Sequence, residues 1–185
     1  DRGLVQGDRR NLVVLSVDAA GAVQWVMADE RPEQDAGRRD LRLVPLADGA
    51  VALVAYLPPG GLSLGGVDLA AATGDDVAVG IMAFAPDGSS LWQARADGGY
   101  AALDLVGAAT PAGDLLLGSI HPQTVLVDGE GTVTDLDEPG SGPTRLVRLD
   151  GTSGALALNT SYPSDTAPHD LGVTDDGTIV VAGRY

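Results

Sequence analysis

The stretch that decides the fold is Asp176-Gly177-Thr178-Ile179-Val180-Val181-Ala182-Gly183, in which a turn glycine is followed by a short apolar strand. The same arrangement occurs earlier, in Asp48-Gly49-Ala50-Val51-Ala52-Leu53-Val54-Ala55 and in Gly113-Asp114-Leu115-Leu116-Leu117-Gly118-Ser119. The turn glycines Gly49, Gly113 and Gly177 are therefore equally spaced. Their fixed period of about 64 residues indicates a repeat architecture.

A second set of glycines recurs in step with the first. Gly21, Gly88 and Gly154 each follow an apolar strand, and they recur at nearly the same interval as the first set. Four residues after each glycine stands a bulky apolar residue, namely Trp25, Trp92 and Leu158. Because glycine adopts positive φ without steric cost, such positions favour tight hairpins. Each repeat is expected to read strand, turn, strand, loop, strand, turn, strand.

An extra hairpin is expected between repeats. Its strands are residues 62–64 and 67–69 in the first gap, and residues 125–127 and 132–134 in the second, with the second turn at Asp128-Gly129. No segment keeps a 3.6-residue apolar period beyond two turns, so no helix is predicted. Four-stranded units repeated along a chain are typical of β-propeller blades. A strand solenoid is the alternative, but its coils are usually shorter, about 20 to 45 residues.

The predicted fold class is therefore all-β, with three four-stranded antiparallel blades of about 64 residues in one domain, 1–185. The approximate units are 1–65, 66–129 and 130–185. Since propellers have about four to eight blades, we expect this chain to be part of a larger propeller. Closure by its own N-terminal segment is the alternative. The expected core includes Val14, Val51, Leu53, Leu116, Val147 and Val180.

Composition excludes several classes of function. The chain of 185 residues has a formal net charge of −15, and all eleven basic residues are arginine. Nucleic-acid binding is disfavoured, because phosphate recognition needs a basic patch. Without cysteine there is no disulfide, thiolate zinc site or cysteine nucleophile. No apolar stretch reaches the roughly 18 residues of a membrane-spanning helix, so no membrane insertion is expected.

Three segments resemble known propeller repeats. The stretch 170–183 resembles the second half of the SBBP-type repeat of secreted bacterial β-propellers, and the stretch 81–92 resembles its first half. This resemblance covers nearly the whole chain and implies blades in an exported protein without a defined activity. The stretch 150–158 is similar to the docking motif of quinoprotein-like propellers, with Leu158 where that motif has Trp. That similarity supports blade packing. It does not support redox chemistry, because the sequence shows neither the calcium-bound cofactor site nor the bulky aromatic platform of quinoprotein enzymes.

Catalytic residues are not expected. His121 and His169 are the only histidines, and a triad can be composed on paper from Ser164, His169 and Asp170. Both histidines stand beside prolines, which favours loop positions, and no nucleophile elbow supports the triad. Trp25 and Trp92 occupy equivalent repeat positions, which favours packing between blades over a ligand platform.

Acidic clusters are the one candidate for a metal site. Asp135, Asp137 and Glu138 could hold Ca²⁺ through oxygen ligands, as could the pairs Asp75-Asp76 and Asp175-Asp176. None fits an EF-hand or a glycine-rich calcium repeat, and solvated hairpin turns are the favoured interpretation. No other cofactor is expected.

The expected function is a non-enzymatic structural or protein-binding module of an exported, surface or periplasmic bacterial protein. Its expected partners are another protein, further blades of the same polypeptide, or copies of itself. The alternative is a carbohydrate-binding or hydrolytic propeller with a site on the blade faces. A polar constellation converging from several blades would favour that alternative.

Overall fold

The computed structural model describes residues 12–29, 41–57, 60–70, 77–98, 106–120, 124–136, 145–161 and 167–184. This part of the chain is all-β, as the sequence predicts, and contains no α-helix. Its one helical element is a single 3₁₀ turn, Ala47–Gly49. No helix of the described residues is long and apolar enough to cross a membrane.

The strands are short and rich in Val, Leu and Ala, which suits pleated sheets. In chain order they are β1 (Val13–Val17), β2 (Val23–Ala28), β3 (Leu41–Pro45), β4 (Val51–Leu57), β5 (Leu62–Leu64), β6 (Val67–Leu69), β7 (Val77–Phe84), β8 (Ser90–Gly98), β9 (Val106–Ala109), β10 (Leu115–Ile120), β11 (Thr124–Val127), β12 (Val133–Asp135), β13 (Arg145–Leu149), β14 (Leu156–Ser161), β15 (Ala167–Val173) and β16 (Ile179–Arg184).

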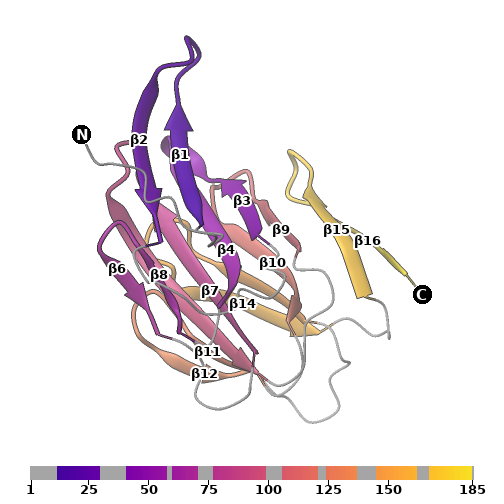
Figure 1. The fold of residues 1–185 in the computed structure, drawn as a ribbon. Coiled ribbons are helices and arrows are strands. Elements are labelled where there is room, and N and C mark those ends of the chain that lie inside the picture. The colour runs from indigo at the N-terminus through magenta and orange to yellow at the C-terminus, as the bar shows by residue number, and fades with distance from the viewer. Residues whose placement is uncertain are drawn as a thin grey trace.

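The strands form antiparallel sheets of three sizes (Figure 1). One sheet has the order β12-β11-β8-β7-β4-β3, and a second has the order β14-β13-β10-β9. Three hairpins, β1-β2, β5-β6 and β15-β16, form two-stranded sheets of their own. Each large sheet contains a four-stranded meander made of two successive hairpins: β3-β4 with β7-β8, and β9-β10 with β13-β14.

Positive φ at the turn glycines explains both periodic sets. Gly21, Gly88 and Gly154 have φ of 84°, 85° and 73°, and they close the hairpins β1-β2, β7-β8 and β13-β14. Gly113 and Gly177, with φ of 90° and 85°, close β9-β10 and β15-β16. Only glycine adopts this region freely.

The inserted hairpins also form, but the second differs in its turn and its partner. Its turn runs from Asp128 to Thr132 and takes its positive φ at Gly131, two residues beyond the expected position. Its first strand, β11, pairs with β8 of the preceding meander. The insertion that lies between β10 and β13 in sequence therefore extends the neighbouring sheet to six strands.

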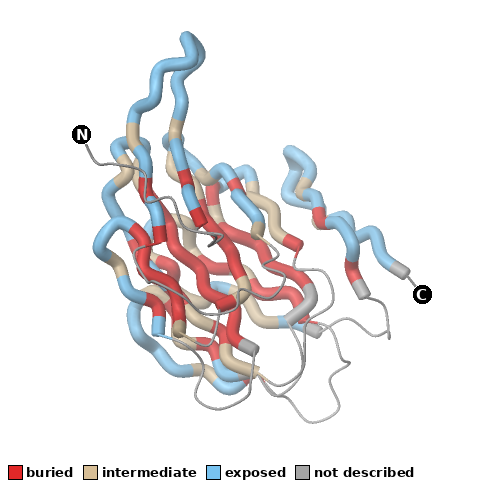
Figure 2. Tube along the Cα trace, viewed as in Figure 1, coloured by how far each residue is buried: buried red, intermediate tan, exposed pale blue. Residues whose placement is uncertain are grey.

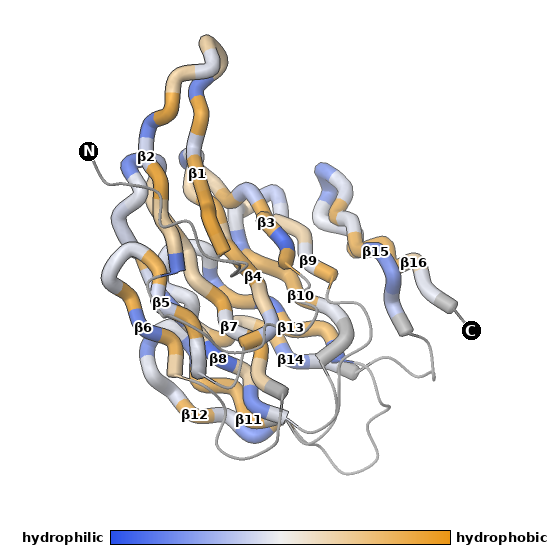
Figure 3. Tube along the Cα trace, viewed as in Figure 1, coloured by the Kyte–Doolittle hydropathy of each residue, from blue (hydrophilic) through white to orange (hydrophobic). Residues whose placement is uncertain are grey.

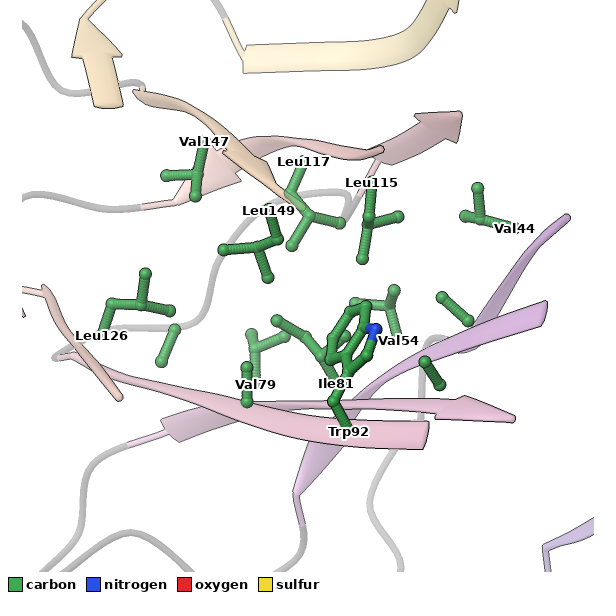
Figure 4. Close-up of a cluster of buried hydrophobic side chains, with 14 of the residues drawn as sticks. Val44, Val54, Val79, Ile81, Trp92, Leu115, Leu117, Leu126, Val147 and Leu149 are labelled. Atoms are coloured by element: carbon green, nitrogen blue, oxygen red, sulfur yellow. The ribbon is translucent and has the colours of Figure 1, made fainter. Parts of the chain in front are cut away.

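The sheets are stacked in sequence order, with an apolar cluster between each pair of layers (Figure 2). The largest cluster lies between the six-stranded and four-stranded sheets and includes Ile81, Trp92 and Leu115 (Figure 4). A second joins the other face of the six-stranded sheet to β1-β2 and β5-β6, and includes Val14, Leu53 and Phe84. A third, smaller cluster lies between the four-stranded sheet and β15-β16.

Strand alternation assigns successive residues to opposite layers. Leu53 belongs to the cluster with β1-β2, whereas its neighbours Ala52 and Val54 belong to the cluster with the four-stranded sheet. Both faces of the large sheets are thus covered, which explains their continuous apolar runs.

Most of the expected core is confirmed. Val14, Leu53, Leu116 and Val147 are buried, and Val51 is half-buried against the second cluster. The expectation for Val180 is wrong, because 54% of this residue is exposed. Val180 lies on the outer face of β15-β16, which no other described layer covers.

The larger architecture is only partly as expected. Two meanders of four strands are complete in the described residues, and β1-β2 and β15-β16 stand as single hairpins at the two ends of the stack. The described strands close no ring.

Candidate functional site

The two tryptophans make the same contact in successive layers. Trp25 of β2 donates a hydrogen bond from Nε1 to the carbonyl oxygen of Pro86, at 2.8 Å. Trp92 of β8 donates from Nε1 to the carbonyl oxygen of Gly151, at 2.9 Å. Each acceptor lies in the turn of the next repeat, so each indole joins one layer to the following one.

The indole rings also explain why each of the contacted turns contains a glycine. A Cβ at Gly88 would lie 2.9 Å from Cγ of Trp25, and one at Gly154 would lie 2.6 Å from Cε3 of Trp92. A side chain there would have to displace a ring, which costs packing energy. Trp92 is only 5% exposed, within the main cluster (Figure 4). These contacts make both tryptophans packing residues between sheets.

Leu158 occupies the third position of this series. Trp25, Trp92 and Leu158 pair with Ser16, Ala83 and Arg148, and the register shifts beside each pair. Leucine has no N–H donor, so this position lacks the hydrogen bond that the two tryptophans make. The four-stranded sheet therefore cannot make this hydrogen bond to whatever lies beyond it, on the side of the stack that faces away from β1-β2.

Asp128 fastens the inserted hairpin to the next layer. Its Oδ1 accepts hydrogen bonds from the backbone N–H groups of Glu130 and Thr132, and its Oδ2 accepts one from Leu156 N–H at 3.0 Å. The N–H of Gly129 also donates to the carbonyl oxygen of Gly154. Asp128 is buried, and its carboxylate links β11-β12 to β14. The sequence indicated only a turn at this residue.

One face of the first hairpin, β1-β2, is apolar and exposed. Val13, Leu15 and Val17 alternate along β1 and point away from the stack, and Val23 and Val26 of β2 are also exposed. About half of Leu15, 51%, is accessible. Figures 2 and 3 show this hairpin as both exposed and hydrophobic. An exposed group of large aliphatic side chains on one sheet face is a candidate association surface.

The repeat explains how unusual this face is. Aligning the hairpins on their turns places Val17 with Phe84 and Leu149, and Leu15 with Met82 and Val147. These four equivalent residues are at most 1% exposed, because the preceding layer covers them. The β1 residues have no such layer over them within the described chain. The alignment of the repeats in the sequence gives the equivalence of these positions, but not the difference in their burial.

A cleft of about 340 Å³ lies between β6, β8 and the β11-β12 turn. Its charged lining residues include Asp68, Arg95 and Asp128. Two nitrogens of Arg95 contact the same oxygen of Asp97, Oδ2, at 2.9 Å from Nε and 2.7 Å from Nη2. Asp128 is engaged by backbone N–H groups. The charged groups at Arg95 and Asp128 therefore hold local structure together.

The residues weighed for catalysis do not form a site in the described structure. His169 and Asp170 are exposed on β15, and Ser164 and His121 lie outside the described residues. Asp135 is exposed on β12, whereas Asp137, Glu138, Asp75 and Asp76 lie outside the described residues. Among the residues described, no three His, Asp or Glu side chains gather in a way that could hold a metal ion.

Three aspartates in hairpin turns have lowered pKa values. The hydroxyl of Thr174 and the backbone N–H of Thr178 donate to Asp176 and lower its pKa to about 2. The Ser89 hydroxyl lowers the pKa of Asp87, and the backbone N–H of Ser153 lowers that of Asp150. Hydrogen bonds to the charged form cause each shift. These carboxylates stabilise turns.

No protein-family model matches the chain, and no curated protein matches it.

Proposed function

We propose that this chain is a non-catalytic structural and protein-binding module built from β-propeller blades. The observation that carries the proposal is the exposed face of β1. Leu15 and Val17 are about half exposed, although their equivalents in the next two layers, Met82, Phe84, Val147 and Leu149, are fully buried. The same face is covered by a preceding layer in two repeats and is open in the first. Such an open apolar face is suited to docking a partner.

The stack itself supports the propeller part of the proposal. Successive four-stranded meanders lie face to face, and each tryptophan joint links one sheet to the next. Radially repeated four-stranded antiparallel sheets are the building units of propellers. One meander plus one inserted hairpin accounts for the near-constant interval between equivalent glycines, as from Gly21 to Gly88 and from Gly88 to Gly154.

We further propose that the chain acts outside the bacterial cytoplasm, which rests on its resemblance to secreted propeller repeats. Fractionation of the native bacterium, with an antibody against this chain, tests the compartment. Detection in the envelope or the medium is expected. Detection in the cytosol alone would overturn this part of the proposal.

Carbene footprinting tests the docking role. The natural protein, released by gentle lysis, is labelled beside the purified chain at high dilution. We expect Val13 and Leu15 to be labelled less in the natural protein, because a partner covers them there. Val133 is a matched control, since it is an apolar strand residue that is 66% exposed on β12. Equal labelling of β1 in the two samples would contradict the proposal.

A further inference from the structure

The hairpins at the two ends of the stack correspond to the two different halves of a four-stranded meander. Each complete meander consists of a hairpin closed by a glycine of the first set (Gly49 or Gly113), followed by a hairpin closed by a glycine of the second set (Gly88 or Gly154). The hairpin β15-β16 is of the first kind, and β1-β2 is of the second kind. Within the described residues, each end hairpin therefore corresponds to the half of a meander that is missing beside the other.

We propose that two copies of this chain associate head to tail, with β16 of one copy pairing antiparallel with β1 of the other. This inference rests on the proposed function and names the partner of the exposed β1 face as a second copy. Each contact completes a four-stranded sheet, β15-β16-β1-β2. Because the two partner surfaces differ, the contact is heterologous and closes a ring when both copies make it.

The register of the pairing follows from the two meanders. In β4-β7, Val51 pairs with Phe84 and Leu53 with Met82. In β10-β13, Leu115 pairs with Leu149 and Leu117 with Val147. The equivalent pairs across the contact are Ile179 with Val17, and Val181 with Leu15.

The faces agree with this register. Within each known pair both residues lie in the same apolar cluster, facing the preceding layer. Ile179 packs against the cluster between the four-stranded sheet and β15-β16. Leu15 and Val17 of the second copy would face the same way and lie over the β13-β14 half of the four-stranded sheet. The strand β15 itself lies against β9 and β10, the other half of that sheet.

A second, independent sign is found at Gly21. Tryptophan rings of the preceding layer cover its equivalents, Gly88 and Gly154, whereas a Cβ at Gly21 would meet nothing within 4 Å. In the proposed contact, the residue above Gly21 is Leu158 of the other copy. Counting the two end hairpins as one sheet gives three four-stranded sheets per chain and six for two copies. This is within the range of about four to eight blades known for propellers.

Light scattering on the 185-residue chain tests the association. We expect a mass twice the 18.7 kDa of the chain at high concentration. A mass of 18.7 kDa at all concentrations up to about 100 µM, where even contacts of modest affinity form, would overturn the proposal. Masses that grow without limit would overturn the closed ring of two.

Cysteine cross-linking tests the register, since the natural chain has no cysteine. The double variant Leu15→Cys with Val181→Cys should give an oxidised covalent dimer, because directly opposed strand residues meet disulfide geometry. The matched control, Val13→Cys with Val181→Cys, is two residues out of register and should cross-link far less. A disulfide within one chain would overturn the proposal in favour of self-closure. Equal cross-linking of both variants would overturn the register.

Leu158→Trp provides a gain of function. If Leu158 lies over the Gly21 turn of a second copy, an indole there can make the hydrogen bond seen at Trp25 and Trp92. A ring of two contains two such contacts, and one hydrogen bond tightens the dimer about fivefold, so we expect dimerisation to tighten about 25-fold in all. Weaker dimerisation would contradict the proposed contact. If the chain is monomeric yet its β1 face is protected in the natural protein, the partner is another protein, and the proposed function survives without this inference.

Discussion

The indole Nε1 of Trp92 lies 2.9 Å from the carbonyl oxygen of Gly151, a residue 59 positions later in the chain. Trp25 and Pro86 stand in the same relation, at 2.8 Å and 61 positions. The two joints have identical chemistry and different burial, since Trp92 lies inside the main cluster and Trp25 is half-buried. Because of this difference, comparing variants of the two tryptophans measures how much burial adds to the stability that each contact between layers contributes.

Trp92→Phe is expected to destabilise the chain more than Trp25→Phe. Each variant loses one hydrogen bond, worth about 1 kcal/mol. Only Trp92→Phe also leaves the acceptor without a donor and a void inside a closed apolar cluster. The total loss for Trp92→Phe is therefore expected to be roughly 2 to 3 kcal/mol. Urea unfolding measures both free energies. Equal losses would show that burial does not control the joint.

Tryptophan fluorescence should separate the same two residues. The chain has only two tryptophans, so Trp25→Phe leaves the signal of Trp92 alone. We expect this variant to emit at shorter wavelength than wild type and to resist quenching by acrylamide, because Trp92 is 5% exposed. A readily quenched Trp92 would contradict its placement between the sheets.

Gly154→Ala should cost more stability than Gly177→Ala. Both positions have positive φ, 73° and 85°, so both variants carry backbone strain of about 1 kcal/mol. Only at Gly154 would the new Cβ also meet the Trp92 ring, whereas at Gly177 it meets nothing within 4 Å. The added overpacking is expected to cost roughly 1 to 3 kcal/mol. Thermal unfolding of the pair gives the difference, and similar melting temperatures would exclude the ring contact.

Asp128→Ala should destabilise the chain more than Asp18→Ala. Both carboxylates accept hydrogen bonds from backbone N–H groups two and four residues later. Each also accepts a third bond, but the donor to Asp18 is the exposed side chain of Gln24, whereas the donor to Asp128 is the backbone N–H of Leu156 and Asp128 is buried. Leaving that donor unsatisfied should cost about 1 to 3 kcal/mol. If denaturant midpoints fall equally in the two variants, the bond to Leu156 contributes nothing.

Asp176 should make stability depend on pH in acid. Its pKa in the folded chain is about 2, below its ordinary value of 3.8, so folding favours the charged form. The contribution is complete above about pH 4 and is lost as the pH falls through about 2. Asp176→Asn should therefore lose less stability than wild type over this range.

The control for that experiment is Asp175→Asn, which removes the same formal charge from the same turn. Urea midpoints at several pH values compare the three proteins, and NMR titration of the Asp176 carboxyl reports its pKa directly. An Asp176 titration near 3.8 would contradict the hydrogen bonds from Thr174 and Thr178.

Strands and turns were predictable because they depend on local chemistry. Glycines that recur at a near-constant interval mark positions of positive φ, and the apolar runs beside them form strands. Pairing was less predictable, since β11 could have joined either neighbouring sheet, and sequence periodicity does not distinguish the two. Val180 was assigned to the core on its pattern, but burial also needs a covering layer, which a strand pattern does not specify.

The candidate site was predictable only in part. The equivalence of Trp25 and Trp92 predicted packing, but their acceptors, Pro86 and Gly151, depend on the way the layers are stacked. Asp128 could not be distinguished from other turn aspartates, because its third partner, Leu156, is distant in sequence. The exposure of Leu15 became meaningful only when its buried equivalents were seen.

The pairing of β11 with β8 has a consequence for local unfolding. The inserted hairpin is hydrogen-bonded to β8, and the N–H of Gly129 in its turn donates to the carbonyl oxygen of Gly154, so the six-stranded and four-stranded sheets cannot separate without breaking backbone bonds. They should open as a single foldon, with amides that exchange with deuterium only at the slowest rates. In the single chain, the hydrogen-bonded ladder of β15-β16 contains only two strands, so its amides are free to exchange through a separate and much faster fluctuation.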